Sequence, residues 1–244
     1  MEKRRRIVII GATSGIGYEV ARLFCRQGWH VAIAGRRAER LEAFQKEICP
    51  DVVTGIVDVT ANNAVEQLQQ LTDRLGGMDL FLLCAGIGSQ NRQLDAAIEE
   101  ATVETNVKGF TRMVDAAWSY FRQHSGGHIA VISSIAGTKG LGAAPSYSAS
   151  KRFQNTYIEA LSQLARMERL PIFFTDIRPG FVKTDLLKDE RYPLLMQPDQ
   201  VARLIVKALM RKKKRVVIDW RYRLLVFFWR LIPDGLWERL PIHN

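Results

Sequence analysis

The chain has 244 residues and a formal net charge of +10, from 35 Lys and Arg against 25 Asp and Glu. With 47% hydrophobic and 25% charged residues it can bury a core, which excludes disordered, collagen-like and low-complexity proteins. The three cysteines, Cys25, Cys49 and Cys84, form neither a disulfide framework nor a zinc-ligand spacing, so we expect a reducing, cytoplasmic location and no metal site. No apolar run approaches the roughly 20 residues of a membrane span.

Six short apolar runs have the character of strands covered on both faces of a sheet. They are residues 6–10, 30–34, 52–57, 78–83, 128–132 and 172–177, and residues 216–218 are a candidate seventh strand. Segments with apolar residues at helical spacing separate these runs. The alternation predicts an α/β fold, a doubly wound Rossmann-type parallel sheet of about seven strands flanked by helices in a single domain. Ligands of such sheets bind beyond the carboxyl ends of the strands.

Three glycines, Gly11, Gly15 and Gly17, follow the first predicted strand, and a helix is expected from Ile16. Gly11 permits the tight turn, Gly15 lets the backbone approach a pyrophosphate, and Gly17 lets the helix pack on the sheet. Amide groups at the start of a helix bind phosphate. The pattern predicts a dinucleotide site, with a plain strand–helix turn as the alternative.

Arg36 and Arg37 end the second predicted strand, about 20 residues after the glycine turn, where a dinucleotide fold contacts the ribose. A guanidinium offers planar, bidentate donors to a 2′-phosphate, so we expect NADP(H) to be preferred over NAD(H). The alternative is that both arginines only begin the next helix on a solvated face. Asp58, at the end of the third strand, is suited to an adenine amino group or to capping a helix that starts near Ala61.

Ser134 follows the fifth predicted strand, and Tyr147 and Lys151 are spaced to share one face of the next helix. A phenol titrates near pH 10 in isolation, and a nearby ammonium lowers that pKa. Tyr147 would then exchange a proton with a substrate oxygen near neutral pH, while the Ser134 hydroxyl holds the same oxygen.

These motifs resemble those of the short-chain dehydrogenase/reductase family, over residues 6–219. The matching pieces, in order, are GATSGIG at 11–17, DVT at 58–60, CAG at 84–86, Asn106 in ETNVKG, ISS at 132–134, YSASK at 147–151 and PGFVKT at 179–184. The resemblance implies that Tyr147 is the general acid–base and that Lys151 lowers its pKa and binds the nicotinamide ribose. It also implies that Ser134 orients the substrate oxygen and that Asn106 holds a water linking Lys151 to solvent.

The same resemblance implies a cofactor site along the carboxyl edge of the sheet. Besides Tyr147 and Lys151, its residues would be Gly11, Ser14, Gly15, Ile16, Gly17, Arg36, Arg37, Asp58, Val59, Ala85, Gly86, Pro179, Gly180, Val182 and Thr184. Thr184 would lie near the nicotinamide carboxamide. The chain departs from the family in having Ile10 for the usual Thr and Cys84 for the usual Asn. We expect Cys84 to be a buried small thiol, with a nucleophilic role as the alternative.

The substrate loop is expected between Gly180 and Pro198. It carries apolar residues that could close over a carbonyl compound, namely Phe181, Leu186, Leu187, Tyr192, Leu194 and Leu195, together with Lys183, Asp185, Lys188, Asp189, Glu190 and Arg191. Residues 134–144 are rich in small side chains, which leaves room beside Tyr147.

We divide the chain into a domain at 1–219 and a basic, aromatic extension at 220–244. Such an extension could pack on its own domain, including the substrate cleft, on a second subunit, or at a membrane surface, with arginines at the headgroups. The resemblance implies a homodimer or homotetramer formed through helices around 100–123 and 147–168. The basic run at 211–215 comes with no nucleic-acid motif, so nucleic acid is not expected as a partner.

The sequence thus predicts an NADP(H)-dependent oxidoreductase. It would transfer hydride between the nicotinamide and a carbonyl or secondary alcohol, such as a 3-oxoacyl compound or another ketone. The alternative is a non-catalytic NADP-binding sensor or scaffold on the same fold.

Overall fold

Seven parallel strands form the centre of the computed structural model, which describes residues 4–187 and 192–242. Their order is β3-β2-β1-β4-β5-β6-β7. Strands β2 and β3 are thus added on one side of β1, and β4 to β7 on the other side. This confirms the predicted doubly wound fold. The strands are β1 (Arg6–Ile10), β2 (His30–Gly35), β3 (Val53–Ile56), β4 (Leu80–Leu83), β5 (Gly127–Ile132), β6 (Ile172–Arg178) and β7 (Arg215–Val217).

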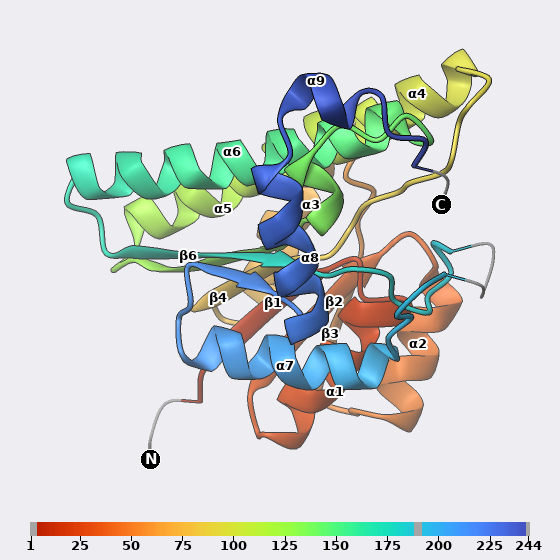
Figure 1. Ribbon diagram of the computed structural model, residues 1–244. Coiled ribbons are helices and arrows are strands. Elements are labelled where there is room, and N and C mark those ends of the chain that lie inside the picture. Colours follow the sequence, from red (N-terminus) through yellow and green to blue (C-terminus); the bar gives the residue numbers. More distant parts are fainter. Residues whose placement is uncertain (1–3, 188–191, 243–244) are drawn as a thin grey trace.

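Helices cover both faces of the sheet (Figure 1). On one face lie α1 (Gly15–Arg26), α2 (Ala38–Glu47) and α7 (Pro198–Met210). On the other lie α3 (Ala64–Arg74), α5 (Phe110–Gln123) and α6 (Pro145–Met167). A helix α4 (Ala96–Val103) continues into α5 through a π-helical turn, η1 (Glu104–Gly109), and a 3-10 turn, η2 (Ile135–Thr138), follows β5.

The strand β1 shows how the sheet separates two apolar cores. Ile7 and Ile9 belong to the cluster under α1 and α7, whereas Val8 and Ile10 belong to the cluster under α3, α5 and α6. Successive side chains of a strand point to opposite faces, so a run that is apolar throughout supplies both cores at once. The strand is therefore fixed at the centre of the sheet, and its carboxyl end at Ile10 opens into the glycine-rich turn.

The fourth strand begins later than the sequence predicted, at Leu80 instead of residue 78. Met78 gives its backbone N–H to the Tyr120 hydroxyl at 3.0 Å, and the Asp79 carboxylate accepts hydrogen bonds from Arg6. Met78 thus uses its N–H outside the sheet, whereas the backbone of Asp79 bonds to Arg6 and His128 and leads into the ladder that starts at Leu80. The seventh strand is likewise displaced by one residue, to Arg215–Val217, because Asp176 pairs with Arg215 at the start of the ladder.

The C-terminal extension forms α8 (Trp220–Leu231) and α9 (Asp234–Trp237), and α8 packs against the cluster under α7. Tyr222 anchors it: the buried hydroxyl accepts from the backbone N–H of Phe181 at 3.1 Å and lies 3.1 Å from the carbonyl oxygens of Pro193 and Leu194. The extension therefore holds both ends of the predicted substrate loop. No helix within residues 4–187 and 192–242 is long and apolar enough to cross a membrane.

Replacing Tyr222 with Phe should lower the free energy of unfolding by about 1–2 kcal/mol, because buried backbone groups lose their partner. Denaturant unfolding followed by circular dichroism measures this. Tyr18→Phe, which keeps the ring contact with Phe44, is the control and should change stability by less than about 0.5 kcal/mol. Equal effects of the two substitutions would contradict the anchoring role.

Candidate active site

The glycine-rich turn follows a backbone path that a side chain would block. Gly11 has a φ of +87°, and a Cβ atom there would lie 2.5 Å from the amide nitrogen of Ala85. A Cβ on Gly17 would lie 2.3 Å from the carbonyl oxygen of Gly11. Ser14 precedes the first residue of α1, Gly15, so the amino end of this helix lies at the carboxyl edge of the sheet. Helix amino ends favour anions, so the turn fits a pyrophosphate.

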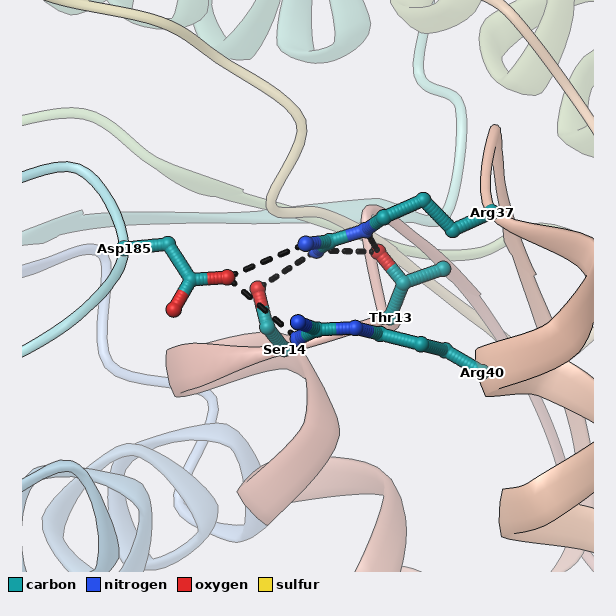
Figure 2. A network of polar contacts seen from close by, with 5 residues as sticks. All are labelled: Thr13, Ser14, Arg37, Arg40 and Asp185. Carbon is teal, nitrogen blue, oxygen red and sulfur yellow. Dashed lines mark hydrogen bonds and ion pairs between the residues drawn. The ribbon is translucent and has the colours of Figure 1, made fainter.

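Figure 2 shows a network of polar side chains beside this turn. Arg37 donates from Nε and Nη2 to Thr13 Oγ1, at 3.0 and 2.7 Å, and from Nη2 to Ser14 Oγ at 2.7 Å. The Asp185 carboxylate, which follows β6, accepts from Arg37 Nη1 at 3.0 Å and from Arg40 Nη1 at 3.3 Å. The hydrogen bond from Arg37 and the contact with Ser14 hold the pKa of Asp185 below its usual range.

In this network a carboxylate occupies the position between two guanidinium groups. The Asp185 carboxylate therefore marks a position that holds a negative group. The two guanidinium groups that bind it also have the fork geometry that suits a phosphate. Sequence reasoning named Arg37 but missed Thr13 and Arg40 and gave Asp185 no role at this point. Arg40 could have been found, because it lies in the first turn of α2, three residues after Arg37, which precedes that helix.

The structure separates Arg36 from Arg37. Arg36 is exposed and faces Asp58, where its charge helps to lower the carboxyl pKa. Partial burial opposes this shift, and hydrogen bonds from the backbone and hydroxyl of Thr60, at 3.0 and 2.8 Å, outweigh the burial. Asp58 thus closes a turn on Thr60. The expectation that a helix starts near Ala61 is wrong, since α3 begins at Ala64.

Residues after β4 lie between the glycine-rich turn and Lys151. Ala85 donates its N–H to the carbonyl of Ile10 at 3.1 Å, and Gly86 adjoins both Asn106 Oδ1 and Lys151 Nζ. Val59, from the segment after β3, packs against Gly109 of η1. Burial raises the pKa of the Cys84 thiol to about 12, which keeps it protonated and argues against the nucleophilic alternative.

Ser134 and Tyr147 meet at the carboxyl end of β5. Ser134 Oγ accepts from the backbone N–H of Ala136 at 3.1 Å, which holds the serine at the start of η2. Tyr147 lies in the first turn of α6, with its ring against Gly88. Burial raises the pKa of the phenol, and a hydrogen bond with Ser134 lowers it by a smaller amount. The phenol is therefore protonated at neutral pH in this structure.

Lys151 lies one turn after Tyr147, with Nζ 5.7 Å from the centre of the tyrosine ring. The ammonium donates to the carbonyl of Ile132 at 3.2 Å and to Gln154 Oε1 at 3.1 Å. Burial lowers its pKa to about 8, against the opposing charge of the Asp176 carboxylate. The expectation that Lys151 holds the tyrosine pKa below its usual value differs from the structure, because burial of the phenol is the larger effect and the ammonium bonds elsewhere.

Asn106, fully buried in η1, has both ends of its side chain engaged. Its Oδ1 accepts from the N–H of Ile87 at 2.9 Å, while Nδ2 donates to the Ile87 carbonyl at 2.7 Å and to Ser150 Oγ at 3.1 Å. Its backbone carbonyl accepts from Gln154 Nε2 at 2.9 Å. The Asn106 side chain thus joins the segment after β4 to α6, and Gln154 is a site residue that sequence reasoning missed.

The segment after β6 contacts η2, α8 and the glycine-rich turn. The Pro179 carbonyl accepts from the N–H of Ile135 at 3.1 Å, Gly180 adjoins the Tyr222 ring, and Val182 pairs with Met196. The Thr184 side chain lies against Gly15. Thr184, expected near the nicotinamide carboxamide, thus lies beside Gly15, expected at the pyrophosphate. The predicted loop residues Lys188, Asp189, Glu190 and Arg191 lie outside the described residues.

The C-terminal extension supplies a wall beside Tyr147. Trp237 is buried against Ala136 and Leu141 in a cluster that also includes Tyr147. Its indole N–H donates to the Gly140 carbonyl at 2.7 Å, and Lys139 Nζ donates to the carbonyl of Ile232 at 2.9 Å. The tyrosine is therefore bounded by an apolar, aromatic surface.

Comparison with known proteins identifies this arrangement. The family model described as short chain dehydrogenase matches residues 5–193. The chain belongs to the short-chain dehydrogenase family. An uncharacterized oxidoreductase from Myxococcus xanthus is 31% identical over 242 residues, covering 96% of this chain and 95% of the relative. The protein is accordingly an NAD(P)-dependent oxidoreductase acting on CH–OH groups.

Solved structures of the family share the fold. A short-chain type dehydrogenase/reductase from Mycobacterium marinum has a TM-score of 0.79 and 26% identity, covering 88% of this chain and 94% of that one. An alcohol dehydrogenase from Thermococcus sibiricus, solved with 5-hydroxy-NADP, has a TM-score of 0.78 and 23% identity, covering 88% of this chain and 96% of that one. The short-chain dehydrogenase fold generally takes small-molecule substrates and often forms oligomers.

Proposed function

We propose that this short-chain dehydrogenase is an NADP(H)-dependent reductase of ketones, reversible as a secondary alcohol dehydrogenase. The observation that carries the proposal is the meeting of Ser134, a protonated Tyr147 and the Lys151 ammonium at the carboxyl end of β5. A phenol that keeps its proton at neutral pH is suited to donating that proton to a carbonyl oxygen.

When bound, the reduced nicotinamide supplies the hydride for the substrate carbon. Tyr147 gives its proton to the substrate oxygen, so the ketone becomes a secondary alcohol. The Ser134 hydroxyl orients that oxygen, and the Lys151 ammonium favours the negative charge left on the tyrosine. The reverse sequence returns the proton to Tyr147 during alcohol oxidation.

The surroundings of Tyr147 favour a ketone with apolar substituents. Trp237, Leu141 and Ala136 form an apolar wall, and residues 134–144 are mostly small. A 3-oxoacyl compound or another lipid-like ketone has the chemistry that such a wall selects. The rival hypothesis, a non-catalytic NADP-binding sensor or scaffold, does not explain why a serine, tyrosine and lysine converge beside an apolar wall.

Tyr147→Phe should leave NADPH affinity nearly unchanged and lower turnover by about a hundredfold to ten-thousandfold, because the proton donor is lost. NADPH absorbance with a panel of ketones measures turnover, and NADPH fluorescence measures affinity. Tyr157→Phe, on the same helix beside Asp115, is the control and should retain activity. Binding of NADPH by the wild-type protein without turnover of any ketone would favour the sensor instead.

The preference for NADP(H) rests on the guanidinium pair of Arg37 and Arg40. Asp185 already satisfies both groups with one carboxylate, so the position accepts negative charge. A 2′-phosphate offers more charge and more acceptor oxygens than a carboxylate, and a free 2′-hydroxyl offers neither advantage. The arginines Arg37 and Arg40 therefore favour NADP(H) over NAD(H).

Arg37→Ala should weaken NADPH binding by about tenfold to a hundredfold and leave NADH binding unchanged, because a charge-assisted contact to the phosphate is lost. Asp185→Ala should act in the opposite direction, strengthening NADPH binding by about twofold to fivefold through loss of a competing exposed ion pair. Fluorescence titration with both nucleotides tests the pair. Parallel changes in NADH affinity would contradict a 2′-phosphate site.

We further propose that the protein is a cytoplasmic homo-oligomer. The surface of α6 supports this, because Leu164 and Met167 are exposed near its end. Together with the helices around 100–123, it offers an apolar contact between copies. Light scattering on the purified protein measures the mass in solution.

The outward face of α8 supports peripheral contact with an anionic membrane. It consists of Trp220, Leu224, Phe227, Phe228 and Leu231, which share one side of the helix and are between 50% and 63% exposed. The helix carries no acidic residue and three arginines, Arg221, Arg223 and Arg230, and Arg239 follows beyond its end. A second copy of this chain would oppose arginine with arginine, whereas anionic headgroups complement them.

Phe227→Ser combined with Phe228→Ser should weaken binding to phosphatidylglycerol vesicles by about tenfold or more, because two phenyl groups no longer enter the interface. Vesicle sedimentation measures the bound fraction. Met167→Ser, which alters an exposed apolar residue on α6, is the control. Unchanged partitioning of the double variant would exclude this face as a membrane contact, and a change in oligomeric mass would assign it to a second copy.

A further inference from the structure

Gln154 connects Lys151 with the backbone of Asn106, two parts of the site that are far apart in the sequence. It lies on α6, three residues after Lys151, and is only 1% exposed. Its Oε1 accepts from Lys151 Nζ at 3.1 Å, and its Nε2 donates to the backbone carbonyl of Asn106 at 2.9 Å. One amide thus satisfies a buried cation on one side and a buried carbonyl on the other.

The π-helical turn η1 brings the carbonyl of Asn106 within reach of this amide. A π-turn widens the backbone hydrogen-bond register, and such turns recur at functional sites because they redirect carbonyl groups. The Asn106 side chain fixes the turn against Ile87 and Ser150. The acceptor for Gln154 Nε2 is therefore held rigidly, and with it the orientation of Oε1 toward Lys151.

A lysine ammonium has three N–H donors on a flexible stem. In Lys151 one donor is used by the Ile132 carbonyl at the end of β5 and one by Gln154. Two acceptors from different elements limit rotation of the ammonium. One donor remains for the tyrosine or the nicotinamide ribose, the partners expected for this lysine.

We infer that Gln154 is a positioning residue that holds the Lys151 ammonium in place and in its charged form for cofactor binding and catalysis. The inference rests on the proposed function. In this inference the Gln154 side chain links Lys151 to Asn106, where the family resemblance implied a water molecule held by Asn106.

The charges around Lys151 make this role measurable. Asp176 on β6 carries the negative charge that favours the charged form of Lys151, the Cys84 thiol near it stays neutral, and burial disfavours the charged form and brings the pKa to about 8. Tyr147 faces the ammonium from α6. An ammonium with this pKa loses its proton within the pH range of ordinary activity assays. Removing or changing its hydrogen-bond acceptor therefore shifts the pH at which activity falls on the alkaline side.

Two substitutions should move that limb in opposite directions. Gln154→Met keeps the length of the side chain but removes the acceptor, so the ammonium is less favoured and the pKa of Lys151 falls. Gln154→Glu adds a carboxylate beside the ammonium, so that pKa rises. Each displacement should be about one pH unit, which corresponds to a tenfold change in the protonation equilibrium.

The titration of Lys151 is followed by NMR in cofactor-free protein with isotopically labelled lysine, and Lys151→Arg assigns the resonance. NADPH affinity and kcat/KM are then measured from about pH 6 to about pH 10, where the ammonium titrates. Their alkaline limbs should move with the NMR midpoint. Gln45→Met is the control, since Gln45 also donates to a backbone carbonyl, that of Val52 at 2.8 Å, but lies on α2.

The inference is overturned if both Gln154 variants keep the wild-type NMR midpoint of Lys151 and the wild-type alkaline pH dependence of NADPH affinity and kcat/KM. This holds even if both variants are less stable or slower. If Gln154→Met does not fold, the upward displacement expected for Gln154→Glu decides alone. If the wild-type protein binds no NADPH, the proposed function fails, and the NMR midpoints in cofactor-free protein still test Gln154.

Discussion

A buried ammonium at the carboxyl edge of the sheet is the constraint on which the rest of the site depends. Removing a cation from water is costly, so it persists only where acceptors surround it. For Lys151 these come from the end of β5 and from Gln154, while the Asp176 carboxylate lies near on β6. Strand β5, the turn η1 and helix α6 therefore have to be correctly placed relative to one another before Lys151 can carry its charge. The chemistry of Tyr147 depends on the same arrangement.

Much of this architecture follows from local sequence signals. Strand runs such as RIVII at β1 are apolar at every position, which only a two-sided sheet accommodates, and Gly11 and Gly17 occupy points where a Cβ atom would collide with backbone. Ser134, Tyr147 and Lys151 could be found because their spacing brings them together by strand-end and helix geometry alone. Family resemblance added residues, such as Asn106, that spacing could not have chosen.

The sequence could not reveal contacts between residues that are distant in the chain. Asp185 reaches Arg37 across 148 positions, and Trp237 reaches Gly140 across 97. Gln154 lies near Lys151 in sequence, but its acceptor is the carbonyl of a π-turn that no periodicity predicts. The pKa of Tyr147 also differed from expectation, because the balance between burial and a nearby charge depends on where the ammonium points.

The carboxylate between Arg37 and Arg40 has a consequence for the order of events during turnover. Asp185 and the proposed 2′-phosphate of NADP(H) would compete for Arg37 and Arg40, so binding of that phosphate would displace the Asp185 carboxylate from a segment whose Thr184 lies against Gly15. Displacement of Asp185 and binding of the phosphate are thermodynamically linked, and the linkage is reciprocal. On the proposed function, binding of the nucleotide would thus free the segment expected to close over the ketone, which favours binding of the cofactor before the substrate.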